Sequence, residues 1–263
     1  MSMNTNKWNA KDYANNSSAQ ESWANELLEK LALKGNEHLL DIGCGDGKIT
    51  HSIAKKLSNG QVVGIDRSED MIKLAINKFN RENLAFYTMD VTELSVQGKF
   101  DVVFSNAVLH WVKNHKAVLV QLKNHLHKKS KILFQMGGYG NAEDILKIVT
   151  QATKLEQWAE YFENFSFPYR FCNIQDYEKW LPESGYRANR IELIPKDMIH
   201  DNTDKLKGWL RTTWFPYTDQ LPEKEKENFL THIVEEYSKT NPVDSRGRTK
   251  VKMVRLEVEA ILA

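Results

Sequence analysis

Residues 39–47 read LLDIGCGDG, a short apolar run followed by three glycines that alternate with other residues. Glycine in such a turn lets the backbone bend tightly and lets a ligand approach the main chain. A dinucleotide-binding loop has the spacing Gly-x-Gly-x-x-Gly, whereas here the third glycine, Gly47, comes one residue early. Asp41 stands two residues before Gly43, and an acidic strand end repels phosphate but suits the ammonium group of an amino-acid tail. The stretch therefore predicts a strand–loop–helix unit that binds a ligand carrying such a tail; the alternative is that the glycines serve only to form the turn.

Polar residues end the next three predicted strands, at the sheet edge where a ligand is expected. Asp66 follows Gly43 by about 20 residues, the spacing of a carboxylate that accepts both hydroxyls of a ribose. Asp90 could accept a hydrogen bond from an adenine amino group while the Val91 amide donates to the ring; the alternative for Asp90 is a helix N-cap. Asn106 ends the fourth strand, in the crevice at the carboxyl edge.

The first two-thirds of the chain alternates short apolar runs with amphipathic stretches. The runs that we predict as buried parallel strands are 39–42, 62–65, 84–87, 102–104 and 132–136. Helical patterns lie around them at 19–33, 47–57, 69–79 and 115–126. This alternation predicts an α/β fold with a Rossmann-like, doubly wound, mostly parallel sheet.

The last third differs in organisation. It adds two predicted strands, 188–194 and 251–258, which bring the sheet to seven strands. We expect a small helical cap inserted between these last two strands, at about 195–249. Further cap elements are expected in a stretch that is rich in aromatic residues, at about 148–186. The whole chain, 1–263, would then form a single domain.

The composition limits which binding partners and which cellular location we expect. The 263 residues carry 36 basic and 35 acidic side chains, a balance that gives no electrostatic reason to expect a nucleic acid or a bilayer. No run approaches the ~20 apolar residues of a membrane helix, and residues 1–20 lack the apolar core of a signal peptide. Cys44 and Cys172 do not indicate a disulfide scaffold, and the histidines show no metal-ligand spacing. We therefore expect a cytoplasmic protein without a metal; the oligomeric state is open.

In combination, these motifs resemble the ordered motifs of class I methyltransferases that depend on S-adenosylmethionine (SAM). The matching stretches are DIGCGDGK at 41–48, GIDRS at 64–68, MDV at 89–91 and FDVVFSNAVLHWV at 100–112. The resemblance covers about residues 8–140. It implies a transferase that binds SAM and releases S-adenosylhomocysteine (SAH), and the lack of metal-ligand spacing predicts that it works without a metal.

The resemblance also implies which residues hold the cofactor. They are Gly43, Gly45 and the Asn106 carbonyl for the methionine part, Asp66 for the ribose, Asp90 and Val91 for the adenine, and Arg67 and Met71 beside the adenine or ribose. Asp41 is a further candidate for binding the cofactor, because its negative charge suits the methionine ammonium.

More narrowly, the chain is similar to the branch that contains trans-aconitate and insect juvenile-hormone-acid methyltransferases. This likeness rests on Trp8, Tyr13 and Gln20 and on LHW at 109–111. Trans-aconitate methyltransferases carry an Arg near the position of Gln20 that reaches the SAM carboxylate. Gln20 can donate only a neutral hydrogen bond, which is closer to the juvenile-hormone-acid branch. Tyr13 would belong to an N-terminal segment that closes over SAM, or would simply anchor that segment to the surface.

Methyl transfer from a sulfonium is an in-line displacement, so the protein mainly positions the acceptor and excludes water. A carboxylate acceptor is already ionised and needs no general base, whereas a hydroxyl or an amine favours one, for which His110 is the candidate. The alternative for His110 is a packing role. Trp111 borders the acceptor pocket in the resembling family, although it could belong to the core. Tyr139, in a glycine-dense loop after the fifth strand, is the side chain there most able to reach an acceptor.

Arg211 is the remaining candidate. It stands in the stretch GWLRTTWFPY at 208–217, and an aromatic wall with one cation suits an organic anion because Arg binds carboxylates in a planar fork. The alternative is a helix packed by its tryptophans, with Arg211 in solvent.

The sequence thus favours methyl transfer to a small-molecule acceptor, at oxygen and with a carboxylate as one candidate. Three alternatives stay open. The chain could methylate a macromolecule such as tRNA or protein, against which stand the balanced charge and the absence of an Asn-Pro-Pro-aromatic motif at 105–108. It could bind SAM without turnover, or bind a nicotinamide cofactor, which the early third glycine disfavours.

Overall fold

The structure is a computed structural model that describes residues 18–263, with side chains from residue 23 onward. The expected contributions of Tyr13 and of the Gln20 side chain lie outside these described residues. The chain divides into two compact units, which are described separately. The first consists of Ser18–Tyr139, Tyr169–Ile194 and Arg255–Ala263, and the second includes Gly140–Pro168 and Pro195–Val254.

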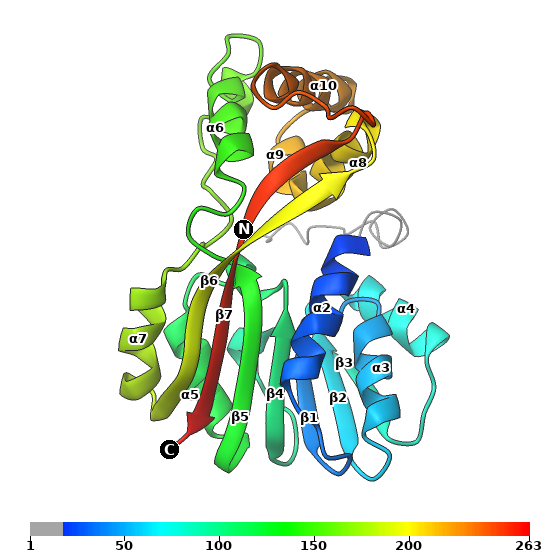
Figure 1. Cartoon of the computed structure of the whole chain (residues 1–263), viewed down its shortest axis with the longest axis vertical. Helices are drawn as coiled ribbons and strands as arrows, with labels where there is room; N and C mark the ends of the chain where they lie inside the picture. Colours follow the sequence, from blue (N-terminus) through cyan, green and yellow to red (C-terminus); the bar gives the residue numbers. More distant parts are fainter. Residues whose placement is uncertain (1–17) are drawn as a thin grey trace. The chain divides into compact units, whose positions relative to one another are not determined.

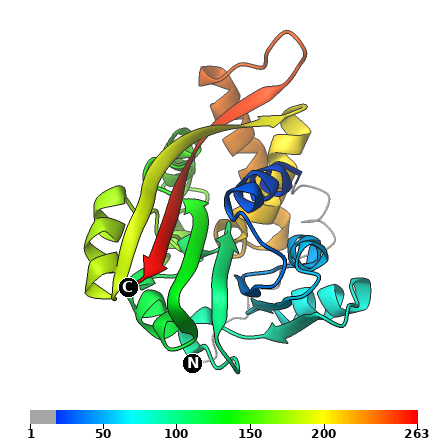
Figure 2. The ribbon, with the colours of Figure 1, turned by 60° about the horizontal axis from the view of Figure 1, so that its bottom comes forward.

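A seven-stranded sheet with the order β3-β2-β1-β4-β5-β7-β6 organises the first unit, although residues 195–200 of β6 and 249–254 of β7 are counted in the second unit (Figure 1). Its strands are β1 (His38–Ile42), β2 (Gln61–Asp66), β3 (Leu84–Thr88), β4 (Phe100–Asn106), β5 (Leu126–Gly137), β6 (Tyr186–His200) and β7 (Thr249–Leu262). The pairs among β1 to β5 are parallel, and β7 runs antiparallel to β5, as Figure 2 shows. The predicted seven-stranded, mostly parallel sheet is thereby confirmed.

Helices cover the two faces of this sheet because alternate strand residues point to opposite sides. One face packs against α2 (Ser18–Lys30) and α3 (Lys48–Lys56), with α4 (Glu69–Lys78) beside β2 and β3. The other face packs against η1 (Val91–Glu93), α5 (His115–Lys123) and α7 (Ile174–Glu183). A short η2 (Leu109–Trp111) follows β4.

Helix α7 corrects one expected boundary. The aromatic stretch at about 148–186 was expected to belong to a cap, but α7 lies in the same compact unit as the sheet. Tyr177 and Leu181 explain this, because both are buried in the apolar cluster that covers the sheet face of Phe134 and Met136. The apolar face of α7 therefore has its partner in the sheet.

The second unit is mainly helical. Its helices are α6 (Glu143–Ala152), η3 (Ala159–Phe162), α8 (Thr203–Thr213), α9 (Phe215–Thr218) and α10 (Glu223–Thr240). Helices α8 to α10 follow one another between β6 and β7 in the sequence, where helices were predicted (Figure 1). Trp158, which directly precedes η3, packs edge-to-face against Phe229 of α10. The two ring centres lie 5.0 Å apart and the ring planes meet at 82°.

Candidate functional site

The glycine loop after β1 needs glycine at each of its three positions. Gly43, Gly45 and Gly47 have φ angles of +72°, +55° and +79°, a region that side chains rarely adopt. A Cβ on Gly43 would lie 2.1 Å from the Val108 side chain, so this glycine is also needed for packing. Gly45 differs, because a Cβ there would meet nothing within 4 Å. The space above Gly45 is therefore open to a ligand.

Asp66 ties this loop to the end of β2. Its Oδ2 accepts a hydrogen bond from the Gly45 amide at 3.0 Å, and its Oδ1 accepts one from the Ser68 amide at 2.8 Å. Burial raises the pKa of Asp66, whereas these two backbone bonds oppose the rise. A carboxylate can accept about four hydrogen bonds, so Asp66 retains capacity for the two hydroxyls of a ribose.

Asp41 is a buried carboxyl group beside this loop. It is 3% exposed, and the Thr50 hydroxyl donates a hydrogen bond of 2.7 Å to its Oδ2. Burial raises the pKa of Asp41 to about 7; the Thr50 bond opposes this, and the Asp66 charge adds to it. A buried carboxylate of this kind gains most from a positively charged partner.

Asp90 caps η1, which was the alternative considered for it. Its Oδ1 accepts hydrogen bonds from both the amide and the hydroxyl of Thr92, at 2.8 and 2.7 Å. Asp90 can cap η1 and contact adenine at the same time, because both capping hydrogen bonds go to Oδ1 and leave Oδ2 for the adenine. Val91, the first residue of η1, is buried.

The two residues predicted beside the cofactor differ in exposure. Met71 is buried in the first turn of α4. Arg67 is exposed, and its guanidinium carbon lies 6.0 Å from the centre of the Trp111 ring. Arg67 therefore links the end of β2 to the segment after β4.

His110 is buried next to the end of β5. Its Nδ1 accepts a hydrogen bond of 3.4 Å from the Gly137 amide. Burial, followed by the charges of Arg255 and His115, holds the pKa of His110 well below its ordinary value. A neutral imidazole that accepts at Nδ1 carries its proton on Nε2, so His110 is placed as a hydrogen-bond donor.

Aromatic rings surround His110, and two of them come from a segment that the sequence analysis had assigned elsewhere. Tyr169 meets the Trp111 ring edge-on at 4.6 Å and stacks on Phe171 at 5.7 Å. The backbone holds this segment in place, because the Arg170 amide donates to the His110 carbonyl at 2.7 Å. The aromatic run was visible in the sequence, but the backbone pairing that brings it beside η2 was not.

The backbone of Tyr139 pairs with the same segment, the one that carries Tyr169 and Phe171. Its amide donates to the Cys172 carbonyl at 2.9 Å, and its side chain is 65% exposed.

Arg211 lies in the second unit, on α8. It is exposed, whereas four aromatic residues around it in the sequence are buried: Trp209, Trp214, Phe215 and Tyr217. The tryptophans thus pack the helix, as in the alternative for this stretch. A contact between Arg211 and an acceptor stays a prediction.

Two further features concern the described residues only. Within them, no group of three or more His, Cys, Asp or Glu side chains could hold a metal ion. Nor is any described helix long and apolar enough to cross a membrane.

A seven-stranded Rossmann-like sheet with a glycine loop and acidic strand ends defines the class I methyltransferase fold. The methyltransferase domain family model matches residues 33–185, which is more than half of the chain, and the chain therefore belongs to that family.

Individual relatives and one solved structure extend this likeness. The chain is 25% identical to the trans-aconitate 2-methyltransferase of Agrobacterium fabrum, over 97% of this chain and 98% of the relative. It is 29% identical to the malonyl-[acyl-carrier protein] O-methyltransferase of Acetivibrio thermocellus, over 73% and 68%. The magnesium protoporphyrin IX methyltransferase of Synechocystis, solved with bound SAH, has a similar fold, with a TM-score of 0.55 and 16% identity over 96% of this chain and 86% of that one.

Proposed function

We propose that this enzyme transfers the methyl group of SAM to a carboxylate of a small organic acid and so forms a methyl ester. Two of its relatives are named for carboxylic acid substrates, trans-aconitate and a malonyl group. The proposal makes the acceptor an anion that already carries its negative charge at neutral pH.

The residues at the strand ends fit SAM as the cofactor. Gly45 leaves open space, Asp66 retains acceptor capacity for two hydroxyls, and buried Asp41 suits the ammonium of the methionine part. Membership of the methyltransferase family and the SAH bound to a similar fold support the same cofactor. When bound, SAM supplies a methyl group on a positively charged sulfur.

The state of His110 is the observation that carries the choice of acceptor. Its Nδ1 is occupied by the Gly137 amide and its pKa lies well below the ordinary value, so it is a poor base. A hydroxyl or amine acceptor would need a proton removed, whereas a carboxylate needs none. His110 instead uses its Nε2–H to orient a carboxylate oxygen.

Trp111, Tyr169 and Phe171 complete this side of the site. Their rings form an apolar surface around His110 that excludes water from an incoming acid. Exclusion of water strengthens the hydrogen bond that His110 donates, because the local dielectric is lower than in bulk solvent.

A transfer assay with SAM labelled in its methyl group tests the proposal. A panel of free carboxylic acids is compared with matched alcohols and amines, and malonyl-acyl carrier protein is included as a carboxylate on a protein. We expect label in the acids, released by mild base as methanol. Label that resists base, or label found only on alcohols or amines, would refute carboxylate transfer. Label on the carrier protein alone would move the acceptor from a small molecule to a macromolecule.

A further inference from the structure

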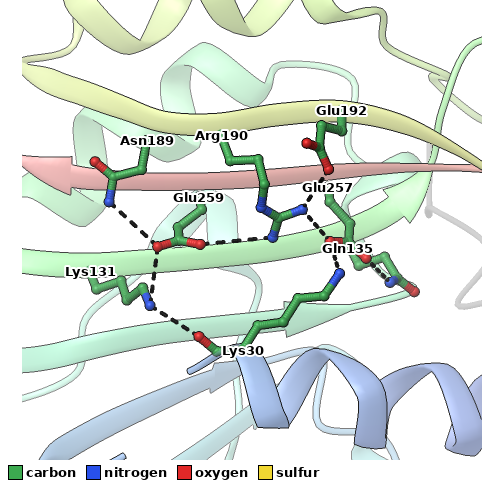
Figure 3. A network of polar contacts seen from close by, with 8 residues as sticks. All are labelled: Lys30, Lys131, Gln135, Asn189, Arg190, Glu192, Glu257 and Glu259. Carbon is green, nitrogen blue, oxygen red and sulfur yellow. Dashed lines mark hydrogen bonds and ion pairs between the residues drawn. The ribbon is translucent and has the colours of Figure 1, made fainter. Parts of the chain in front are cut away.

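A polar network lies on the sheet face that α2 covers, and Glu257 of β7 is at its centre (Figure 3). Glu257 is 1% exposed and accepts hydrogen bonds from three side chains: from Lys30 at 2.6 Å, from Arg190, and from the Gln135 amide nitrogen at 2.8 Å. Burial raises the pKa of Glu257, but the three hydrogen bonds outweigh it and lower the pKa below its ordinary value. Glu257 is therefore an ionised carboxylate fixed from three sides.

This carboxylate sets the orientation of Gln135. An ionised carboxylate only accepts hydrogen bonds, so the amide nitrogen of Gln135 must face Glu257 and the oxygen must face away from it. Figure 3 shows this arrangement. Gln135 is 1% exposed, and its Oε1 is buried without a hydrogen-bond partner among the described residues. Buried acceptors of this kind are rare in folded proteins, because an unmade hydrogen bond is costly.

The position of Gln135 in the sheet connects it with the cofactor edge. It pairs in register with Asn106, and β1 lies on the other side of β4. Asp41, Asn106 and Gln135 each follow, by two positions, a residue of one apolar cluster that α2 and α3 cover: Leu39, Phe104 and Leu133. Since side chains alternate along a strand, the three polar residues share that face, near the carboxyl ends of β1, β4 and β5.

We propose that Gln135 Oε1 accepts a hydrogen bond from the ammonium of the SAM methionine part, and that Glu257 is the positioning residue that holds Gln135 for this contact. An ammonium has three hydrogens to donate. The Asp41 carboxylate, the Asn106 carbonyl and Gln135 Oε1 are three acceptors at one edge of the sheet. This inference rests on the proposed placement of SAM at the strand ends.

Calorimetric titration with two ligands tests the contact. SAH contains the ammonium, whereas 5′-methylthioadenosine keeps the adenine, ribose and sulfur but lacks the amino-acid part. In Gln135→Met we expect SAH to bind about tenfold more weakly, the effect of one hydrogen bond to a charged group, and methylthioadenosine to bind as in the unaltered enzyme.

Two further variants separate the contact from general damage to the network. Glu259→Gln removes ion pairs of Glu259 with Lys131 and Arg190, farther from the carboxyl edge, and should change neither affinity. Glu257→Gln keeps the shape of the side chain, but its amide can donate as well as accept a hydrogen bond, so Gln135 is no longer forced to turn its amide nitrogen toward residue 257. The variant should therefore weaken SAH and spare methylthioadenosine. If Gln135→Met does not fold, Glu257→Gln tests the contact instead, through the same comparison of SAH affinity with methylthioadenosine affinity.

The outcomes distinguish this inference from the proposed function. Unchanged SAH affinity in Gln135→Met, or an equal loss for both ligands, would overturn the contact and leave Gln135 a structural residue. Asp66→Ala serves as the reference, because loss of a ribose contact should weaken both ligands. If Asp66→Ala leaves both affinities unchanged, the placement of SAM itself is wrong.

Discussion

The strand ends of β1 to β4 and the segment from α8 to α9 both hold residues predicted to bind a ligand, but they do so by different means. At the strand ends, backbone groups and short side chains are already fixed, as when Asp66 binds the amides of Gly45 and Ser68. In α8 and α9, aromatic side chains form the interior and Arg211 is exposed. A rigid backbone site suits one invariant cofactor, whereas a long side chain on a helix suits an acceptor that differs between relatives. Changes in the first region should therefore act on the cofactor, and changes in the second on the acceptor.

Asp66→Ala should have the largest effect, because it removes two charge-assisted hydrogen bonds to the ribose, each about 1.5–3 kcal/mol. We expect SAH affinity to fall by at least roughly 10²-fold in calorimetry. Asp101→Ala is the matched control, since Asp101 also accepts a backbone hydrogen bond, from the His38 amide at 2.9 Å. Unchanged SAH affinity in a folded Asp66→Ala protein would remove the ribose assignment.

Asp41→Asn should stabilise the protein without cofactor while it weakens SAH binding. Because burial raises the pKa of Asp41 to about 7, the folded state retains a proton between about pH 4 and pH 7 that the unfolded state has lost. The wild-type protein therefore loses stability as pH rises through this window. The variant should gain on the order of 4 kcal/mol above pH 7 and nothing near pH 4, measured by chemical denaturation. A stability difference that is constant with pH would show that Asp41 does not titrate in this range.

Several features of the candidate site could be predicted from the sequence, because they depend on residues that are close together in the chain. The glycine loop, Asp41 and the ends of β1 to β4 are set by strand alternation and local backbone conformation, and the structure places them at one edge. Tyr169 and Gln135 were not predicted as site residues. Tyr169 reaches η2 through backbone pairing about 60 residues away in sequence, a contact with no local signal. Gln135 depends on Glu257, which a β-strand pairing brings beside it from the far end of the chain.

Arg211→Met tests the second region. The substitution keeps the apolar stem but removes the charge. If Arg211 anchors an acidic acceptor, kcat/KM should fall by roughly 10²-fold, whereas SAH affinity should stay unchanged. Arg211→Lys should restore activity only in part, because an ammonium lacks the bidentate fork. Equal weakening of SAH and acceptor, or a loss of folding, would assign Arg211 a structural role.

Gly45→Ala, compared with Gly98→Ala, tests whether the cofactor uses the space above the glycine loop. The expected effect on binding is smaller than in the variants above. Both glycines have positive φ angles, and a Cβ at either meets nothing within 4 Å. Each substitution should therefore cost a similar 1–2 kcal/mol or so of stability. Only Gly45→Ala should weaken SAH, by about tenfold, because its methyl group enters the space above the loop. Equal SAH affinities in the two variants would show that this space is not used by the cofactor.

The dependence of kcat/KM on pH, measured with an accepted acid in the wild type and in His110→Gln, tests most directly whether transfer needs a general base. The amide of Gln keeps a hydrogen-bond donor but cannot act as a base. We predict the same profile shape from about pH 6 to about pH 9 in both proteins, with less than a tenfold loss in the variant. An ascending limb in the wild type that disappears in His110→Gln, together with a loss of roughly 10²–10⁴-fold, would contradict the account and make His110 the base.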